Sequence, residues 1–429
     1  MGGTPGPTPA APVILIRGGR PLRGEVPISG AKNAALPAIF ASLLTSEPVR
    51  LENVPRLADV ETALQLVQAL GKRVRWEAGA VVIEQQAPPT ASPPAELVGR
   101  MRASFLCLGP ILARRGQARV PLPGGCAIGA RPVDLHLKGL ARLGADLRLR
   151  ERWVEAKAAG LRGGEVYLDY PSVGATEQLL LAGALAEGET VILNPAREPE
   201  VEDLGRLLSA MGAEVSWGEK VVRVRGRAEL GGARHRVIPD RIEAGTYLLA
   251  AAACGGTVRV RGVVPQHLGA LLVKLREAAL EVERGRDWVE VVVKDRLQAL
   301  TVETRPHPGF PTDLQPPLVS ALTLARGESV VRETVFENRF GHVPELVRLG
   351  AEIRRQGQTL LVQGVERLVG TRVAASDLRA GAALVVAGLA AHGCTQVERA
   401  WHLRRGYQGL VEKLRGLGAE IWEEADCRE

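Results

Sequence analysis

The sequence predicts an α/β fold of two pseudo-threefold domains, with buried helices inside and with sheets and amphipathic helices outside. The first observation is a repeat: a segment ending in Leu-Gly, or a close variant, recurs at intervals of 67–73 residues. The second is that six such copies account for all 429 residues. This period exceeds the roughly 20–50 residues typical of solenoids and propellers. Because six copies would exceed one ordinary core, we place three in each domain. The marker residues are Gly71, Gly144, Gly212, Ala279, Gly350 and Gly418.

The third observation is that each copy has the same internal order. It begins with a small, apolar segment such as residues 32–44, and a helix without a polar stripe must be buried on all sides. A turn and a short strand follow, as in residues 189–196. Next comes an amphipathic helix such as residues 59–70, apolar at i, i+3 and i+4, and its closing glycine caps the C-terminus. Two short strands, as in residues 213–226, complete most copies.

The composition excludes several classes of protein. With 46% hydrophobic and 24% charged residues, the chain is typical of a globular protein and not of a disordered one. Aromatic residues make up only 3%, which argues against a stacking platform for nucleic acid. The net charge is +7, but 48 acidic residues are interspersed with 55 basic ones. We interpret the excess as a cationic pocket for an anionic substrate; a plain basic surface is the alternative, and no nucleic-acid partner is expected.

Other features bear on cofactors and location. Five cysteines without a CxxC pair and scattered histidines favour a reducing cytoplasm, no metal and no cofactor. The Pro/Gly-rich residues 1–12 suggest a disordered leader and not a signal peptide. Apolar stretches such as residues 247–254 are too short to span a bilayer, so we expect no membrane partner.

Polar residues cluster at the N-terminal ends of the expected buried helices, where free N–H groups and the helix dipole attract phosphate or carboxylate. For any single Asp, Ser or Thr the ordinary alternative is an N-cap. That alternative does not explain Lys32, Arg102, Arg379 and Arg405, which the dipole would repel. An anionic partner explains them better.

Cys126 lies in the glycine-rich segment 121–132, five residues before Arg131. A cysteine is usually a small buried hydrophobe. A loop rich in glycine can approach a ligand closely and move as a lid, so we favour a catalytic role for Cys126.

Many motifs in the right order carry a resemblance. They are ISGAKNAALP (28–37), MRAS (101–104), PGGCAIGARPVDLH (123–136), SVGATE (172–177), NPAREPE (194–200), PDRIEAGT (239–246), HPGFPTD (307–313), ENRF (337–340), SDLRAG (376–381) and RGY (405–407). Together they cover nearly everything from Ile14 to Glu420, and they resemble the enolpyruvyl transferases, in particular the branch acting on UDP-N-acetylglucosamine. The branch acting on shikimate 3-phosphate lacks the PGGC segment.

The resemblance implies three βαβαββ units in each domain, an inside-out α/β barrel. The implied domains are residues 1–31 plus 240–429, and residues 32–239, which carry Cys126; the active site would lie in the cleft between them. The implied reaction moves the enolpyruvyl group of phosphoenolpyruvate to the 3-hydroxyl of UDP-N-acetylglucosamine and releases phosphate, the first committed step of peptidoglycan synthesis. Transfer to shikimate 3-phosphate, or a non-catalytic paralogue that binds nucleotide sugars, remains the alternative.

The resemblance also implies residue roles. Cys126 would be the general acid, able also to attack phosphoenolpyruvate, and the epoxide fosfomycin should alkylate it. Asp313 would be the base near the sugar hydroxyl, and Lys32 and Arg405 would act with them in catalysis. The clamp on phosphate and carboxylate would be Lys32, Arg131, Arg339, Arg379 and Arg405. The nucleotide-sugar contacts would be Asn33, Arg102, Arg131, Pro132, Val133, Asp134, Leu135, Ser172, Val173, Gly174, Asp313 and Val335. Asp240 and Asp377 would be pocket carboxylates.

A few residues depart from the family pattern. Arg404 stands where an acidic residue is expected, Gly341 where a bulkier one is, and Pro317 where glutamine is. Tyr170 replaces a lysine found in some members, and Ala279 takes the glycine position of the repeat. None of these changes removes an expected catalytic side chain.

Overall fold

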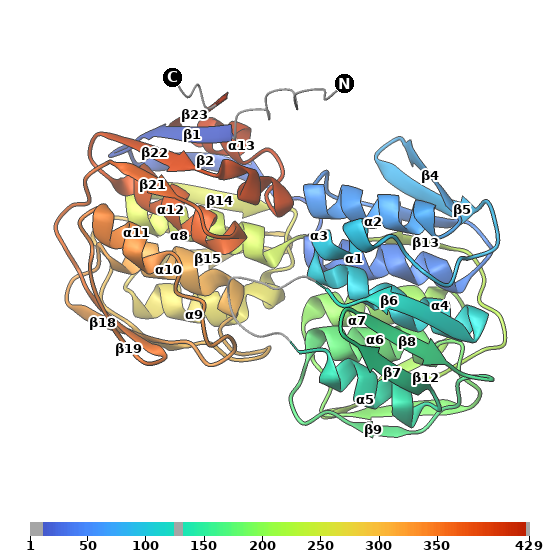
Figure 1. Ribbon diagram of the computed structural model, residues 1–429. Coiled ribbons are helices and arrows are strands. Elements are labelled where there is room, and N and C mark those ends of the chain that lie inside the picture. Colours follow the sequence, from blue (N-terminus) through green and yellow to red (C-terminus); the bar gives the residue numbers. More distant parts are fainter. Residues whose placement is uncertain (1–11, 124–131, 426–429) are drawn as a thin grey trace, which may run out of the picture. The chain divides into compact units, whose positions relative to one another are not determined.

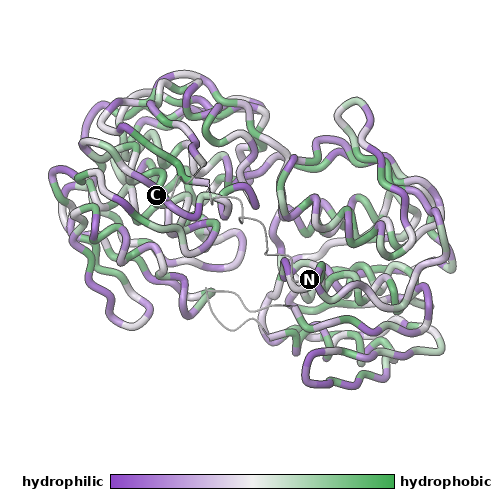
Figure 2. The backbone as a smooth tube through the Cα atoms, turned by 45° about the horizontal axis from the view of Figure 1, so that its top comes forward, coloured by the Kyte–Doolittle hydropathy of each residue, from purple (hydrophilic) through white to green (hydrophobic). Residues whose placement is uncertain are grey.

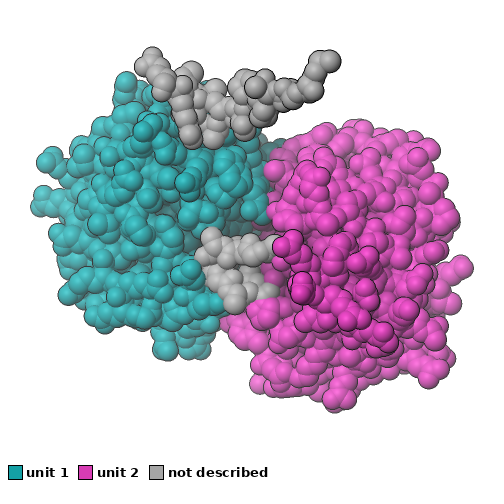
Figure 3. Space-filling view, viewed as in Figure 1, with its two compact units in different colours: residues 1–28, 241–305, 309–429 teal, residues 29–240, 306–308 magenta. Residues whose placement is uncertain are grey.

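The computed structural model describes residues 12–123 and 132–425. The chain divides into two compact units, coloured separately in Figure 3. Unit 1 comprises residues 1–28, 241–305 and 309–429, and unit 2 comprises residues 29–240 and 306–308. The domains implied by the resemblance, residues 1–31 plus 240–429 and residues 32–239, differ from these units at residues 29–31, Asp240 and residues 306–308.

Buried helices form the centre of unit 1 (Figure 1). They are α8 (Arg241–Cys254), α10 (Gln315–Leu322) and α12 (Leu378–Ala390), and each packs against the other two. Every residue from Leu378 to Leu389 is buried, as is every residue of α10. The absence of a polar stripe is therefore explained, because these helices have no face toward water. The hydropathy colouring in Figure 2 shows apolar residues running along such interior segments.

The described part of unit 1 contains three four-stranded sheets around these helices. The first has the order β15 (Glu281–Arg284), β16 (Trp288–Val293), β14 (Gly256–Arg261) and β2 (Leu22–Pro27). The second has the order β17 (Thr301–Glu303), β18 (Glu328–Arg332), β20 (Thr359–Gln363) and β19 (Glu352–Gln356). The third has the order β21 (Arg372–Ala374), β22 (Cys394–Glu398), β1 (Pro12–Arg17) and β23 (Glu420–Ala425). Each sheet joins one parallel pair to two antiparallel pairings, which is the βαβαββ pattern.

Unit 2 repeats this plan around α1 (Lys32–Ala41), α4 (Leu108–Arg115) and α6 (Val173–Gly183). One sheet has the order β13 (Ala233–Arg236), β3 (Val49–Glu52), β5 (Ala80–Gln85) and β4 (Lys72–Glu77). Another has the order β11 (Glu214–Trp217), β12 (Val221–Arg225), β10 (Glu189–Leu193) and β9 (Glu165–Tyr167). The α/β architecture predicted from the repeat is thus confirmed.

The remaining sheet of unit 2 has three strands among the described residues, in the order β6 (Gln117–Pro121), β8 (Trp153–Lys157) and β7 (Asp146–Arg150). A proline-rich segment, residues 86–94, lies along the edge of β6. The N–H of Arg119 donates to the carbonyl of Ala91, and the Ser92 hydroxyl donates to the carbonyl of Arg119. Prolines lack the N–H groups that would extend this pairing into a fourth strand. Helix α3 (Ala95–Arg100) and the 3-10 helix η2 (Arg102–Cys107) then lead into α4.

Strands distant in sequence complete several copies. Strand β1 inserts between β22 and β23, so the first strand closes the last copy. In unit 2, β13 pairs in parallel with β3, although 180 residues separate them. The shorter helical segments are η1 (Ser42–Leu44), η3 (Pro265–Leu268), η4 (Thr312–Leu314) and η5 (Ala400–Arg405). Among the described residues, every helix is too short or too polar to cross a membrane.

The outer, amphipathic helices end as the repeat predicts. They are α2 (Ala58–Ala69), α5 (Asp134–Arg142), α7 (Pro199–Ala210), α9 (Gly269–Glu277), α11 (Val343–Arg348) and α13 (Leu410–Gly416). All six marker residues have positive φ, from 65° at Ala279 to 111° at Gly212. After each of the last five markers, the next amide donates to a carbonyl five residues earlier, as in Leu280 to Leu275, which is a Schellman cap.

The alanine at this left-handed position generates a prediction. An Ala279→Gly substitution should stabilise unit 1 by about 1 kcal/mol, because a Cβ is strained at positive φ. The matched control is Gly350→Ala, where φ is 95° and no heavy atom lies within 4 Å of the added Cβ. Thermal unfolding should show a higher Tm for Ala279→Gly and a lower one for Gly350→Ala. An unchanged or lower Tm for Ala279→Gly would contradict this explanation.

Candidate active site

A carboxylate held between two guanidinium groups lies at the helix N-termini of unit 1. Asp313 is on η4, just before α10, and Arg379 is in the first turn of α12. Nη2 of Arg339 lies 2.7 Å from Asp313 Oδ1, and Nη2 of Arg379 lies 2.8 Å from Oδ2. The two arginine side chains are only 7% and 4% exposed, whereas Asp313 is 23% exposed. Two buried cations against one carboxylate favour the binding of a further oxyanion.

The start of α12 explains how a cation is tolerated at a helix N-terminus. Asp377 is the N-cap, and its Oδ1 accepts hydrogen bonds from the N–H groups of Arg379 (2.9 Å) and Ala380 (3.1 Å). Its Oδ2 accepts a bond from the Ser376 hydroxyl at 3.1 Å. Asp377 and Asp313 therefore supply negative charge where the dipole alone would repel Arg379. For Asp377 the structure shows the ordinary N-cap.

Tyr407 fixes the other side of the Arg379 fork. Arg379 Nη1 donates to the Tyr407 hydroxyl at 3.1 Å, and that hydroxyl lies 3.0 Å from Thr246 Oγ1 on α8. All three side chains are buried, so the guanidinium plane is set from two directions. Arg405 ends η5, two residues before Tyr407. The adjacent Arg404 is exposed and pairs with Glu423 at 2.6 Å, which directs its unexpected charge to the surface of unit 1.

Arg339 is held by a second set of groups. Its Nη1 donates to Thr312 Oγ1 at 2.8 Å, and that hydroxyl donates to Glu333 Oε2 at 3.0 Å. Glu333 is fully buried, and its Oε1 accepts the N–H of Val335 at 2.9 Å. Thr312, Glu333 and Tyr407 were not among the predicted site residues. The RGY motif could have pointed to Tyr407. No sequence signal distinguishes Glu333 from an ordinary polar residue that follows a strand.

His342 lies close to this cluster in sequence and is 1% exposed. Burial lowers the pKa of its imidazole to about 3; the neighbouring charge of Asp377 opposes this shift and that of Arg339 adds to it. The preceding residue, Gly341, has no room for a side chain, since a Cβ would lie 2.4 Å from the Ser376 hydroxyl. Gly341, which departs from the family pattern, is therefore required by the close approach of Ser376.

In unit 2, Lys32 is surrounded by carboxylates. It begins α1, and its N–H donates to Asp240 Oδ2 at 3.3 Å. Its Nζ lies 3.4 Å from Asp59 Oδ2, with side-chain exposures of 12% and 8%. Asp59 is in the first turn of α2 and was not among the predicted residues. Asn33 follows Lys32 in α1 and is half-buried. The charge of Lys32 is thus compensated within unit 2, as that of Arg379 is within unit 1.

Apart from Asn33, the predicted nucleotide-sugar residues of unit 2 that the structure describes lie at the starts of α5, α6 and η2. Arg102 Nη2 donates to the carbonyl of Pro132 at 2.8 Å, just before Val133 caps α5 and Asp134 and Leu135 form its first turn. Ser172 caps α6, and its Oγ accepts the N–H of Ala175 at 3.3 Å. Val173 and Gly174 follow, and a Cβ on Gly174 would lie 2.7 Å from Nε2 of His136 on α5. The glycine therefore lets the two helix ends meet.

Two predicted site residues, Cys126 and Arg131, lie outside the described residues. Within residues 12–123 and 132–425, no group of three or more His, Cys, Asp or Glu side chains could hold a metal ion.

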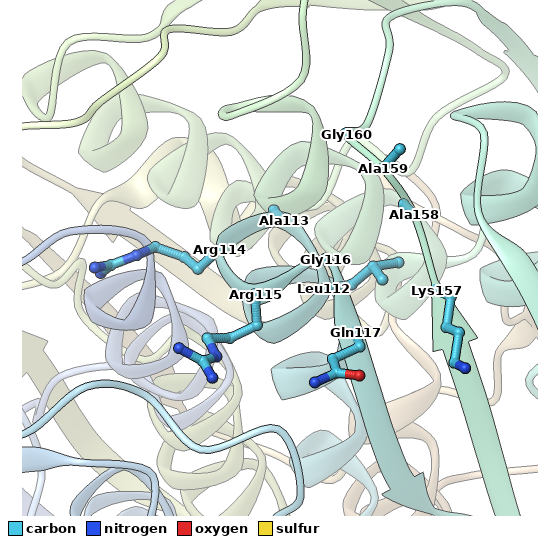
Figure 4. A pocket seen from close by; sticks show the side chains of 10 residues that line it. All are labelled: Leu112, Ala113, Arg114, Arg115, Gly116, Gln117, Lys157, Ala158, Ala159 and Gly160. Atoms are coloured by element: carbon cyan, nitrogen blue, oxygen red, sulfur yellow. The ribbon is translucent and has the colours of Figure 1, made fainter.

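A cavity of about 520 Å³ in unit 2 is unrelated to these residues. Its lining runs from Leu112 to Gln117 and from Lys157 to Gly160 (Figure 4). Arg114, Arg115 and Lys157 point in different directions in Figure 4, so their charges do not converge on one anion. The guanidinium of Arg114 also donates to the carbonyl of Leu43. We assign the cavity no role in the chemistry.

Comparison with known proteins identifies the family. Residues 16–414 match the family model described as EPSP synthase (3-phosphoshikimate 1-carboxyvinyltransferase). The chain belongs to this family. It is also 52% identical over 416 residues to UDP-N-acetylglucosamine 1-carboxyvinyltransferase 2 of Carboxydothermus hydrogenoformans, covering 96% of this chain and 99% of that protein. A UDP-N-acetylglucosamine 1-carboxyvinyltransferase of Gloeobacter violaceus is 52% identical over 421 residues, covering 97% and 92%.

Solved structures of this family have the same fold. The enolpyruvyl transferase NikO of Streptomyces tendae superposes with a TM-score of 0.88 at 29% identity, covering 97% of this chain and 99% of that one. EPSP synthase of Acinetobacter baumannii gives a TM-score of 0.73 at 19% identity, covering 96% and 100%. The second likeness supports the fold alone.

The buried His342 generates a prediction about pH. Its imidazole stays neutral in the folded protein where the unfolded chain would bind a proton, so the folded state binds fewer protons between about pH 3 and 6.5. Stability contributed by this group is present above pH 6.5 and is lost as the pH falls, by at most about 1.4 kcal/mol per pH unit. In thermal unfolding between pH 7 and 4.5, the Tm of His342→Gln should fall less than that of the wild type. The exposed His392, replaced by Gln, is the control; equal slopes for both variants would contradict the prediction.

Proposed function

We propose that this protein transfers the enolpyruvyl group of phosphoenolpyruvate to the 3-hydroxyl of UDP-N-acetylglucosamine and releases phosphate. The observation that carries the proposal is 52% identity, over nearly the whole chain, to proteins named for this activity. The geometry of unit 1 suits it, because a partly exposed carboxylate beside two buried guanidinium groups pairs a base with cations for an anionic substrate.

The proposed chemistry assigns a task to each group. Asp313 accepts the proton of the sugar hydroxyl, whose oxygen bonds to carbon 2 of phosphoenolpyruvate while carbon 3 receives a proton from Cys126. Loss of a proton from carbon 3 and cleavage of the bond from carbon 2 to the phosphate oxygen then restore the double bond and release phosphate. Lys32, Arg131, Arg339, Arg379 and Arg405 hold the phosphate and carboxylate. Such proton transfers typically contribute about 10²–10⁴-fold each.

Unit 2 supplies most of the proposed nucleotide-sugar contacts. Arg102 offers a guanidinium group, and residues 132–135 and 172–174 offer helix N-termini, which suit a diphosphate. With Asn33, Asp240, Asp377 and Val335 they complete the proposed binding set. The reaction would be the first committed step of peptidoglycan synthesis, in the cytoplasm, and so would serve cell-wall formation and cell division. It needs no cofactor and no nucleic-acid or membrane partner.

The competing function differs from the proposed one in its acceptor alcohol, which would be shikimate 3-phosphate in place of UDP-N-acetylglucosamine. The family description itself names 3-phosphoshikimate, whereas the PGGC segment (123–126) and the names of the 52% identical relatives favour the nucleotide sugar. Phosphate release from phosphoenolpyruvate, with UDP-N-acetylglucosamine and shikimate 3-phosphate offered in parallel, separates the two. Release with shikimate 3-phosphate and none with the nucleotide sugar would refute the proposal.

Replacing the proposed base should abolish most turnover without unfolding the protein. We expect Asp313→Asn to lower kcat by about 10²–10⁴-fold, because the amide cannot accept the hydroxyl proton. The control is Asp295→Asn, which alters an aspartate that is 65% exposed on the same unit and paired with Arg326. Steady-state rates and Tm should be measured for both; a near-normal kcat for Asp313→Asn would remove it as the base.

Fosfomycin tests the proposed thiol. Treatment with this epoxide should alkylate Cys126 and stop turnover, while Cys107 and Cys254 stay unmodified because burial raises the pKa of both thiols. Intact-mass and peptide mass spectrometry give the site. Full loss of turnover with Cys126 unmodified would contradict its assignment.

A further inference from the structure

The buried carboxylate of Glu333 is the centre of a hydrogen-bond network that the proposed chemistry does not use directly. It is 0% exposed and lies at the end of β18, outside every predicted site motif. Its two oxygens accept four hydrogen bonds. Oε1 accepts from Thr304 Oγ1 (2.9 Å), Val335 N (2.9 Å) and Phe336 N (3.1 Å), and Oε2 accepts from Thr312 Oγ1 (3.0 Å). Oε1 accepts three of these bonds and Oε2 accepts one, so both oxygens are engaged and Oε1 has no acceptor position left.

Glu333 sets the direction of the Thr312 hydroxyl. Because that hydroxyl donates its only proton to Oε2, its lone pairs remain for Arg339 Nη1, which donates to it at 2.8 Å. Arg339 in turn holds Asp313 at 2.7 Å. A chain of three contacts thus connects a fully buried glutamate to the partly exposed carboxylate at the centre of the site. Glu333 orients the Thr304 hydroxyl in the same way: Thr304 Oγ1 donates to Oε1 of Glu333 and accepts the N–H of Thr334 at 2.9 Å.

The other oxygen of Glu333 holds the backbone of residues 334–336. This segment contains Val335, one of the proposed nucleotide-sugar contacts of unit 1. A backbone segment can present a group to a ligand reproducibly only when its own N–H groups are satisfied and its conformation is fixed. Oε2 of Glu333 is therefore connected through Thr312 to Arg339, which belongs to the proposed anion clamp. Oε1 holds the backbone at Val335, a proposed sugar contact.

We propose that Glu333 is a positioning residue that orients Arg339 through Thr312 and, with its other oxygen, fixes the Val335 segment against the acceptor sugar. The inference rests on the proposed function and adds to it a division of labour between the two oxygens. Glu333 touches neither substrate and acts through the groups that it holds.

The test separates the two oxygens. Thr312→Val removes the hydroxyl between Glu333 and Arg339, and Thr312→Ser keeps it. Glu333→Gln can keep an oxygen toward Thr304, Val335 and Phe336 while placing an NH₂ toward Thr312. Thr323→Val is the control, because Thr323 is fully buried in unit 1, as Glu333 is, and its hydroxyl donates only to Ser320 O among the described residues, at 2.6 Å.

We expect Thr312→Val and Glu333→Gln to raise KM for phosphoenolpyruvate about tenfold, the effect of weakening one charged hydrogen bond. KM for UDP-N-acetylglucosamine should stay within about twofold, since the contacts of Oε1 are retained. Thr312→Ser should restore the wild-type KM, and Thr323→Val should lower Tm without changing either KM.

Steady-state kinetics with each substrate varied in turn, and a thermal melt of each variant, decide the matter. Equal changes in Thr312→Val and Thr323→Val, or failure of Thr312→Ser to restore KM, would overturn the inference and leave a merely structural glutamate. Failure of the proposed function is recognised separately, as a wild-type enzyme that releases phosphate only with another acceptor. The same comparison of variants then uses that acceptor.

Discussion

The structure of unit 1 depends on a single charge arrangement, the Asp313 carboxylate shared between two buried guanidinium groups. Burying an arginine costs several kcal/mol unless a partner and hydrogen bonds replace its water. Arg339 and Arg379 receive those partners from Asp313, Thr312 and Tyr407. The partners come from η4 and from the segment after η5, whereas the arginines come from α12 and from the segment after β18. The charge cluster therefore fixes how these four segments meet. Its net positive charge is also what suits it to an anionic substrate.

Six copies of one module make such an arrangement possible. In unit 1, side chains near the starts of three buried helices are brought together: Arg379 of α12 contacts Asp313 just before α10, and the Tyr407 hydroxyl connects Arg379 to Thr246 of α8. The outer helices are ended by a left-handed residue in every copy, including the alanine of copy four. The repeat therefore supplies rigid backbone positions, and the copies differ in the side chains placed there: Lys32 in one, Ser172 in another, Asp377 and Arg379 in a third.

The sequence predicted the fold, and it pointed to residues that the structure brings together, such as Asp313, Arg339 and Arg379. The other features depended on long-range contacts. Periodicity and the Leu-Gly caps act locally, so the copies and their buried helices could be recognised without coordinates. The closure of the last copy by β1, and the proline-rich edge that replaces a strand beside β6, depend on pairings across many residues. From the sequence, the cations at helix N-termini indicated only an anionic ligand. In the structure, Asp59 also pairs with Lys32 and Asp313 with Arg379. The spacing of these residues along the chain does not reveal either pair. Glu333 was missed because a glutamate after a short strand is indistinguishable from a solvated one until its burial is known.

We propose that Arg379 binds the substrate anion as a planar guanidinium group, one nitrogen of which is held by the Tyr407 hydroxyl. The measurement that tests this most directly is a calorimetric titration of phosphoenolpyruvate, with UDP-N-acetylglucosamine present, into Cys126→Ser, which should block turnover, and into Cys126→Ser with Arg379→Lys added. A lysine retains the charge but cannot reach Asp313, Tyr407 and a substrate oxyanion with one fixed plane. We expect the Kd for phosphoenolpyruvate to be at least tenfold higher in the Arg379→Lys protein, which lacks the planar guanidinium group, than in the protein that keeps Arg379. Equal affinities would show that charge alone suffices and that the shared carboxylate is not what prepares the site.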